Sequence, residues 1–447
     1  MVTILLSPEL WLGFVILLSL FSSPLEGRRW GLLILGLIWL GLAEYLFSHP
    51  WEVAGVTPWN QWFRGWVLIL TWVLLWLSQR ASAEEFTLIA VVGWTSALMC
   101  LSQSYLSFFL WMELQTLSLF VLVSRRTHSL LSTEAGLKYF VMGAFVSGLF
   151  LFGISLHFHL WGDLTFHPGL GELDMRPLFP SLLIGSALLF KMAAAPFHQW
   201  VPDIYEGANF STLLVLGTLP KLAVFSVLVQ LHLPPVLLWG AGFLSLGVGA
   251  IGALNQTKIK RFLAYSTIGH TGFLMLGLSL GSLVGYQWGA MYLLVYSWTL
   301  VAFVAALTSL PYHWSHLGYL AGLRLKHPWL AFIMSLLLLS MAGIPPLTGF
   351  LVKWGILSTL ISQQAPLTAL GAFLMATLAV VYYIRVVKII YFQPAASWVG
   401  WLTILQGPQM TWSAAYILAF SFYMVVTCLV CPSWLLDSLH WATWCIV

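Results

Sequence analysis

Charged side chains are scarce in this sequence. Asp, Glu, Lys and Arg make up 7% of the 447 residues, against about 25% in soluble domains. Hydrophobic residues make up 60%, and the mean hydropathy is +0.92. This composition excludes a soluble globular protein and indicates a polytopic membrane protein. The net charge of +4 is small and spread over the chain, so nothing indicates binding to nucleic acid.

Cysteine is also rare, and it does not form a cofactor motif. Cys428 and Cys431 make one C-x-x-C pair, but without a second pair or nearby histidines we interpret them as small apolar residues. The sequence lacks a Rossmann glycine fingerprint, an iron–sulfur cysteine set and a haem motif. We therefore expect this chain to bind no cofactor and no metal, and we expect partner proteins to carry any redox chemistry.

Long apolar runs dominate what is present. Runs of about 18 or more apolar residues predict membrane-spanning helices, and the sequence predicts an all-α protein with about fourteen of them. The predicted spans are 4–21, 30–47, 62–77, 86–101, 105–123, 137–160, 181–200, 211–231, 236–254, 262–280, 286–310, 328–362, 366–390 and 410–430. We expect the seventh to be broken at Pro196 and the twelfth at Pro345 and Pro346, because proline removes a backbone donor.

The distribution of Lys and Arg predicts the orientation. With both termini in the outer compartment, the inner loops carry Arg28, Arg29, Arg80, Arg125, Arg126, Lys138, Lys258, Lys260, Arg261, Arg324 and Lys326, and the outer loops carry Arg64 and Arg176. This strong bias places both termini outside.

The two broken helices are five helices apart, which predicts an internal repeat. Five crossings are an odd number, so a second copy must enter the membrane from the opposite side, as in inverted-repeat transporters. We expect helices four to eight and nine to thirteen to be the two copies. The predicted domains are a three-helix segment at 1–85, a first repeat at 86–232, a second, inverted repeat at 233–392, and a C-terminal helix and tail at 393–447.

Each predicted copy has a lysine close to its break, Lys191 before Pro196 and Lys353 after Pro346. A charged side chain at bilayer depth costs about 2.5–3.5 kcal/mol on insertion scales, and a broken helix is tolerated only against protein or a wet cavity. The pattern predicts an ion path. The alternative is a lysine that snorkels to the interface beside a proline kink.

Glu113 and Lys221 are two further ionisable residues inside predicted helices. Glu113 has no charged residue within ten positions on either side, and a nearby ammonium would keep it ionised; alternatively it is a protonated acid bonded to a neighbouring helix. Burial and repulsion from Lys191 both disfavour a charged Lys221, so it could load and release a proton. Otherwise Lys221 is structural and binds carbonyls freed at Pro220.

His198 and His270 are candidate relay residues, because an imidazole can accept a proton on one nitrogen and release one from the other. A packing role is the alternative for both. Arg385 and Lys388 share a helix face near the inner end, and snorkelling explains Lys388. Glu44 lies near a helix end, where an interfacial position is expected.

Several motifs together resemble one family. They are FFLWMELQTL, EAGLKYFVMGAF, FKMAAAPFHQWVPDIYEG, PKLAVF, KIKRFLAYSTIGHTGF and AGIPPLTGFLVKW. The set is similar to the antiporter-like subunits of respiratory complex I, and most of all to the family of chain 2 of NADH-ubiquinone oxidoreductase, called subunit N in bacteria. The resemblance runs from helix four to helix thirteen, and PFHQWVPDIYEG is its most specific part.

The resemblance implies roles for the buried charges. Glu113 and Lys191 would form a pair whose opening and closing moves protons through Lys221 toward Lys353, in a subunit of a proton-pumping NADH:ubiquinone reductase. This chain would carry no redox centre. NADH, FMN, iron–sulfur clusters and ubiquinone would bind to partner subunits.

The resemblance also implies partners and a location. The expected partners are membrane lipids and other membrane-arm subunits, including a chain 4-type and a small chain 4L-type subunit. The expected location is the mitochondrial inner membrane, or alternatively a bacterial plasma membrane. Two other functions stay open: a subunit of a multi-chain sodium–proton antiporter or membrane hydrogenase, and a non-pumping scaffold subunit.

Overall fold

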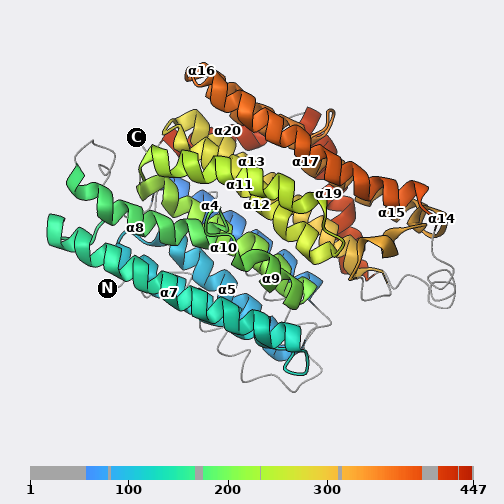
Figure 1. The fold of residues 1–447 in the computed structure, drawn as a ribbon, viewed down its shortest axis with the longest axis horizontal. Helices are drawn as coiled ribbons and strands as arrows, with labels where there is room; N and C mark the ends of the chain where they lie inside the picture. Colours follow the sequence, from blue (N-terminus) through green and yellow to red (C-terminus); the bar gives the residue numbers. More distant parts are fainter. Residues whose placement is uncertain are drawn as a thin grey trace. The chain divides into compact units, whose positions relative to one another are not determined.

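The structure is a computed structural model. It describes residues 57–78, 82–166, 175–231, 233–310, 315–394, 411–430 and 432–444. All named elements in these ranges are helices (Figure 1), and seven of them are long and apolar enough to cross a membrane. The predicted all-α membrane fold is confirmed. The predicted helices at 4–21 and 30–47 lie outside the described residues, as does Glu44.

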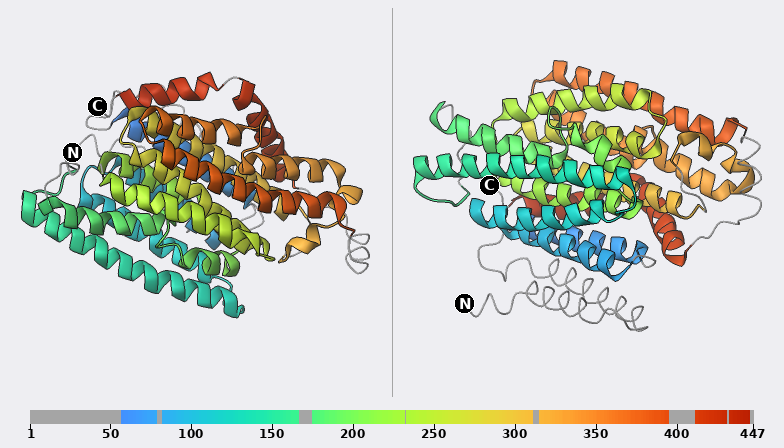
Figure 2. Two further views of the ribbon diagram at one scale, coloured as in Figure 1. Left: turned by 45° about the horizontal axis from the view of Figure 1, so that its top comes forward. Right: turned by 60° about the horizontal axis from the view of Figure 1, so that its bottom comes forward.

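The described chain forms two compact units. The helices of the first unit are α4 (Pro58–Leu77), α5 (Ala83–Leu101), α6 (Tyr105–Ser124), α7 (Leu130–Trp161), α8 (Met175–Met192) and α10 (Phe210–Leu231). In this unit α10 is the central helix, because it is buried along its length and packs against α4, α5, α6 and α8. Figures 1 and 2 show α7 and α8 side by side.

The second unit contains α9 and most of the helices after Pro234. They are α9 (Trp200–Gly207), α11 (Pro235–Leu254), α12 (Ile259–Ser279), α13 (Leu283–Thr308), the 3-10 helix η1 (Leu317–Leu320), α14 (Leu323–Lys326), α15 (Pro328–Ala342), α16 (Thr348–Ser362), α17 (Pro366–Phe392) and α19 (Trp412–Val430). The almost fully buried α13 packs against α12, α15, α16 and α19. The last described helix is α20 (Ser433–Trp444).

Both predicted helix breaks are confirmed. The first break separates α8 from α9, and the second separates α15 from α16. At the second break Gly343 ends α15 with a φ of 82°, in the left-handed region that favours glycine. The order of helices in the two predicted repeats is therefore the same: three continuous, one broken and one continuous. The predicted domain boundaries stay predictions.

Three helices, α4, α7 and α8, begin at least four residues earlier than the sequence predicts. The helix α8 starts at Met175 and not at 181, so Arg176 belongs to it and not to an outer loop. Thr57 accepts a hydrogen bond from the backbone N–H of Asn60 (3.4 Å) and Pro58 takes the first helical position, so α4 starts four residues before the predicted span. Arg64 consequently lies inside α4, with only 2% of its surface exposed, and not in an outer loop. Likewise α7 starts at Leu130, and Lys138 lies within it, paired with Glu134 at 2.7 Å.

The contact between α15 and α16 leaves no room for a side chain at Gly349. A Cβ atom there would lie 1.7 Å from the carbonyl oxygen of Ser340. We expect Gly349→Ala to lower the free energy of unfolding by about 3 kcal/mol, since overpacking forces the backbone to shift. Thermal unfolding of the purified protein in detergent measures this. Gly247→Ala is the control, because a Cβ there meets nothing within 4 Å; equal stability of the two variants would contradict the packing.

Candidate functional site

Lys191 lies in the last turn of α8, directly before the first break. Its side chain is buried, with 7% of the residue exposed, and its Nζ has no hydrogen-bond partner among the described residues. The C-terminal end of a helix carries partial negative charge, which stabilises a cation there. The ammonium also interacts electrostatically with the carboxylate of Glu113 on α6.

Glu113 is half-buried in the middle of α6. Its Oε2 lies 3.4 Å from the hydroxyl of Thr116, one turn later, while Oε1 is buried without a hydrogen-bond partner among the described residues. The structure therefore brings Glu113 into the electrostatic range of Lys191 without a direct hydrogen bond between them. Whether these two residues act in transport stays a prediction.

Lys221 lies in the centre of the first unit. It is 1% exposed and follows Pro220 in α10, the buried central helix. Proline has no N–H group, so the carbonyl one turn earlier lacks its usual helical donor. Since α8 packs against α10, Lys191 and Lys221 belong to neighbouring helices of the same unit.

Lys353 is the buried lysine of the second unit, on α16. Its Nζ donates hydrogen bonds to the carbonyl oxygens of Met341 (3.0 Å) and Ala342 (2.7 Å), the last two residues of α15. The ammonium also lies 5.5 Å from the centre of the Phe273 ring. A Cβ atom at Gly343 would lie 2.7 Å from the Cδ of Lys353. The break in the helix thus supplies both the acceptors and the space for this lysine.

His270 on α12 connects three helices of the second unit. Its Nδ1 lies 2.7 Å from the hydroxyl of Tyr292 on α13, and its Nε2 lies 3.0 Å from the hydroxyl of Tyr383 on α17. A neutral imidazole has one donor and one acceptor nitrogen. One tyrosine must therefore donate to the ring and the other must accept from it.

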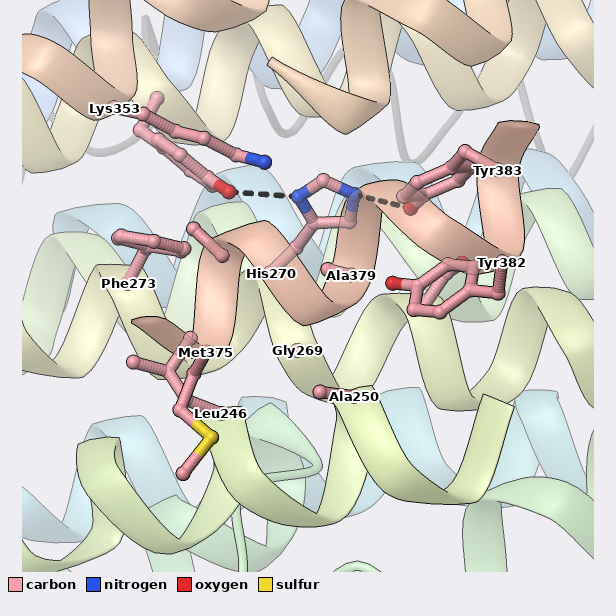
Figure 3. Close-up of a pocket in the computed structure, with 13 residues that line it drawn as sticks. Leu246, Ala250, Gly269, His270, Phe273, Lys353, Met375, Ala379, Tyr382 and Tyr383 are labelled. Carbon is pink, nitrogen blue, oxygen red and sulfur yellow. Dashed lines mark hydrogen bonds between the residues drawn. The ribbon is translucent and has the colours of Figure 1, made fainter. Parts of the chain in front are cut away.

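A small cavity joins His270 to Lys353. Both residues line it, together with Phe273, Tyr292, Tyr382 and Tyr383. A second small cavity is lined by His270, Tyr292 and Lys353 as well, and by Tyr296. In Figure 3 the Lys353 side chain points toward the His270 ring, which lies between it and Tyr383. This geometry permits proton exchange between the ammonium, the hydroxyls and the imidazole.

The remaining predicted residues lie elsewhere. His198 lies in the turn between α8 and α9, and it lines neither of the two cavities beside His270. Arg385 donates from Nη1 to the carbonyl oxygen of Leu254 (2.6 Å), the last residue of α11, so it caps that helix. Lys388 is exposed on α17. The hydrogen bond to Leu254 gives Arg385 a structural role.

An ion cluster joins α9 to the first turn of α12 in the second unit. The carboxylate of Glu206 binds the ammonium of Lys258 and the Nε of Arg261, and Arg261 also contacts Asp203 at 3.2 Å. Burial alone would raise the pKa of Glu206, but the hydrogen bond from Lys258 and the charge of Arg261 outweigh it, so the pKa lies below its ordinary value.

In the described residues no group of three or more His, Cys, Asp and Glu side chains could hold a metal ion.

Comparison with known sequences identifies the family. The family described as "NADH:quinone oxidoreductase/Mrp antiporter, TM" matches residues 102–379. The chain belongs to this family. The match covers both breaks, and it includes Glu113, Lys191, Lys221 and Lys353.

Individual members of the family are also similar. NADH-ubiquinone oxidoreductase chain 2 of Metridium senile is 42% identical over 368 residues, which cover 80% of this chain and 96% of that one. NADH-quinone oxidoreductase subunit N of Coxiella burnetii is 38% identical over 313 residues, which cover 66% of this chain and 65% of that one.

Solved structures share the fold. A chain in the structure of respiratory complex I from Thermus thermophilus with bound aureothin has a TM-score of 0.86 and 26% identity, and the match covers 97% of this chain and 99% of that chain. A chain of the Mrp complex from a Dietzia species has a TM-score of 0.83 at 18% identity, covering 98% and 96% of the two chains. At that identity, the second likeness concerns the fold alone.

The tyrosines around His270 in the second unit are not among the residues predicted from the sequence. Tyr292, Tyr382 and Tyr383 each lie well inside a helix and not at its ends, where aromatic residues of the membrane interface are expected. Buried tyrosine hydroxyls usually require a hydrogen-bond partner. A mid-helix tyrosine facing a mid-helix histidine is therefore the signal that would have indicated the network.

The ion cluster at Glu206 predicts a pH dependence of stability. Because its pKa is lower in the folded protein than the ordinary 4.5, the contribution of Glu206 is complete above about pH 4.5 and is lost as the pH falls through the folded pKa. We expect Glu206→Gln to lower stability at pH 7 by about 1 kcal/mol, a small value because Lys258 and Arg261 are about 40% exposed. The variant should approach the wild type in acid.

Thermal unfolding between pH 7 and pH 3.5 measures this difference. Glu134→Gln is the matched control, since it removes an exposed pair within one helix, and such pairs contribute a few tenths of a kcal/mol. A stability difference for Glu206→Gln that is constant over this pH range would contradict the assignment.

Proposed function

We propose that this chain is the chain 2 or subunit N type of membrane-arm subunit in respiratory complex I and that it translocates protons. The chain 2 and subunit N relatives and the complex I structure support membership in the complex. The observation that carries the transport role is the burial of Lys191, Lys221 and Lys353, exposed by 7%, 1% and 7%, within helices of a membrane protein. Ionisable residues at such positions usually mark ion paths.

In the proposed cycle, the Glu113–Lys191 pair controls proton loading in the first unit. When the carboxylate approaches the ammonium, the charged form of Lys191 is stabilised; when they separate, the proton is released toward Lys221. Two unit charges 4 Å apart interact by about 4 kcal/mol at an effective dielectric constant near 20, which is enough to switch a buried lysine between its two forms. Quinone reduction elsewhere in the complex supplies the energy.

Lys353 and His270 are proposed to act in the second unit. Protons that reach Lys353 would pass to the neighbouring hydroxyls and imidazole, because both cavities are lined by Lys353, His270 and Tyr292. If Tyr292 gives its proton to Nδ1 and takes a new one from Lys353, while Tyr383 takes the Nε2 proton and gives its own hydroxyl proton to the next group of the path, the two hydrogen bonds reverse direction together. His198 is a further candidate, close in sequence to Lys191.

The proposal includes the composition of the complex. We propose that this chain binds no cofactor itself, that NADH, FMN, iron–sulfur clusters and ubiquinone bind to partner subunits, and that a chain 4-type and a chain 4L-type subunit are neighbours in the membrane. The chain is a multi-pass membrane protein. The mitochondrial inner membrane is the proposed location, supported by the chain 2 name of the relative from Metridium senile.

Replacing the buried lysines tests the transport role. We expect Lys191→Gln, Lys221→Gln and Lys353→Gln each to reduce proton pumping at least several-fold, because glutamine cannot carry the proton. The measurement is the pH gradient formed by the intact complex in vesicles when NADH is added, together with its NADH:quinone rate. Lys388→Gln is the control, since Lys388 is exposed on α17.

Two outcomes would support the other functions. Full pumping in assembled complexes that carry the three lysine variants would select a scaffold. Exchange of sodium for protons in vesicles without NADH would select the antiporter.

The relay role of His270 has a separate test. Glutamine can keep one donor and one acceptor between Tyr292 and Tyr383 but does not titrate. We expect His270→Gln complexes to assemble normally and to lose most of their pumping. Pumping per NADH oxidised, measured beside the amount of assembled complex, distinguishes the two effects, and normal pumping would assign a packing role to His270.

A further inference from the structure

A buried tyrosine of α9 has no role in the proposed cycle. Tyr205 is 1% exposed, although α9 is only eight residues long and the next residue, Glu206, belongs to the ion cluster. The Tyr205 hydroxyl forms a hydrogen bond with the side chain of Thr267 on α12, which is also buried. Both residues lie in the second unit. Buried polar groups in a membrane protein are costly and usually functional.

The contacts continue from Thr267 toward Lys353. The side chain of Thr267 also interacts with Tyr296 on α13, and Tyr296 interacts electrostatically with Tyr205. The centre of the Tyr296 ring lies 4.8 Å from the centre of the His270 ring. Tyr296 and Lys353 both line the second small cavity. Three hydroxyl groups of the second unit therefore lead from α9 to the cavity beside Lys353.

These hydroxyls lie between the inner end of α12 and the middle of the membrane. Arg261 is in the first turn of α12, and the distribution of Lys and Arg assigns this end to the inner face. Thr267 and His270 follow Arg261 by six and nine residues, or about 9 and 13 Å along a helix that rises 1.5 Å per residue. The hydrocarbon core is about 30 Å thick. His270 thus lies near the midplane, and Thr267 lies on its inner side.

We propose that Tyr205, Thr267 and Tyr296 form a separate proton inlet that leads from the inner side to Lys353. The second unit then loads part of its protons itself, and not only through Lys221. This inlet rests on the proposed function, since it has meaning only if Lys353 takes up and releases protons.

The hydroxyls pass a proton without becoming charged, because each has one donor hydrogen and an oxygen that accepts. Tyr205 takes a proton from water of the inner side and gives its own to Thr267. Thr267 donates to the carbonyl oxygen of Ala264 (2.7 Å), and rotation of its O–H group toward Tyr296 passes the next proton on. Tyr296 gives its proton, over one water molecule in the cavity, to the neutral amine of Lys353. One proton enters and one arrives.

Removing the hydroxyl of Tyr205 should close the inlet. Tyr205→Phe keeps the ring and its packing and loses only the oxygen. We expect the intact complex in vesicles to pump about twofold fewer protons per NADH oxidised, because one of the two sources of Lys353 loses a proton-transfer group. Tyr105→Phe is the matched control and should pump normally: Tyr105 is buried in the first unit, and its hydroxyl has no hydrogen-bond partner among the described residues.

Substitutions of Thr267 separate the hydroxyl from the shape of the side chain. Thr267→Val keeps the shape without the hydroxyl, and Thr267→Ser keeps the hydroxyl. We expect the valine variant to show the same loss as Tyr205→Phe and the serine variant to pump normally. Thr271→Val is the control, because Thr271 is also buried on α12 and donates to a carbonyl of its own helix, that of Ile268 (2.8 Å), but lines neither cavity. The amount of assembled complex is measured beside pumping.

Each outcome decides the proposal. Normal pumping in assembled Tyr205→Phe or Thr267→Val complexes would overturn it, as would an equal loss in Thr267→Ser or in either control. Failure of both Tyr205→Phe and Thr267→Val to assemble would also overturn it, because the hydroxyls would then be structural; if only one assembles, its pumping decides. If both pump normally while Lys353→Gln loses pumping, the inlet fails and the transport function stands. If Lys353→Gln pumps normally, the transport function itself fails.

Discussion

Carbonyl groups released where a membrane helix breaks need a donor, and the arrangement of the second unit depends on this need. Lipid offers no hydrogen bonds, so an unsatisfied carbonyl in the bilayer costs several kcal/mol. Lys353 donates to the two carbonyls at the end of α15. The break and the buried ammonium therefore stabilise each other, since either alone would be unfavourable. Lys191, in the last turn before the other break, occupies a comparable electrostatic position.

The partners of the buried Lys353 differ from those of the more exposed cations. Arg125, Lys258 and Arg261 bind carboxylates, whereas Lys353 binds neutral carbonyls. A carboxylate partner holds a lysine in its charged form, and removal of the proton would leave a buried negative charge. Neutral partners impose no such penalty. Among the described residues, Lys258 and Arg261 thus form ion pairs near a helix end, whereas Lys353 is held by neutral dipoles, which would allow it to lose its proton in the proposed cycle.

The His270 network follows the same logic with uncharged groups. Two tyrosine hydroxyls from different helices contact the two ring nitrogens, so the ring is fixed in place while its tautomer is free to change. Because α12, α13 and α17 all contribute, a small rotation of one helix would break one of the hydrogen bonds. If His270 relays protons as proposed, helix movement could be coupled to proton transfer in this unit without a large rearrangement.

Much of the fold follows from local sequence. Within the described residues, most predicted spans match helices to within a few positions, and both breaks occur where prolines predict them. The exceptions are the early starts of α7 and α8 and the short elements η1, α14 and α20, which no predicted span covers. Capping chemistry accounts for one difference: the Thr57 cap and Pro58 start α4 early and bring Arg64 into the helix. Glu113, Lys191, Lys221 and Lys353 can also be identified from the sequence, because a charged residue within an apolar run is recognisable without knowledge of how its helix packs.

The sequence does not indicate which groups the buried ionisable residues contact. Tyr292 and Tyr383 are 22 and 113 residues from His270, and the burial of Arg64 against α5 and α10 involves residues far along the chain. The mean hydropathy of a segment identifies it as a membrane span. When a helix is apolar on all sides, however, its sequence does not indicate which face packs against which neighbouring helix. The sequence by itself therefore determined the spans, the breaks and the buried charges. Only the tertiary structure decided the rotation of each helix about its axis, and with it the groups that each buried charge contacts.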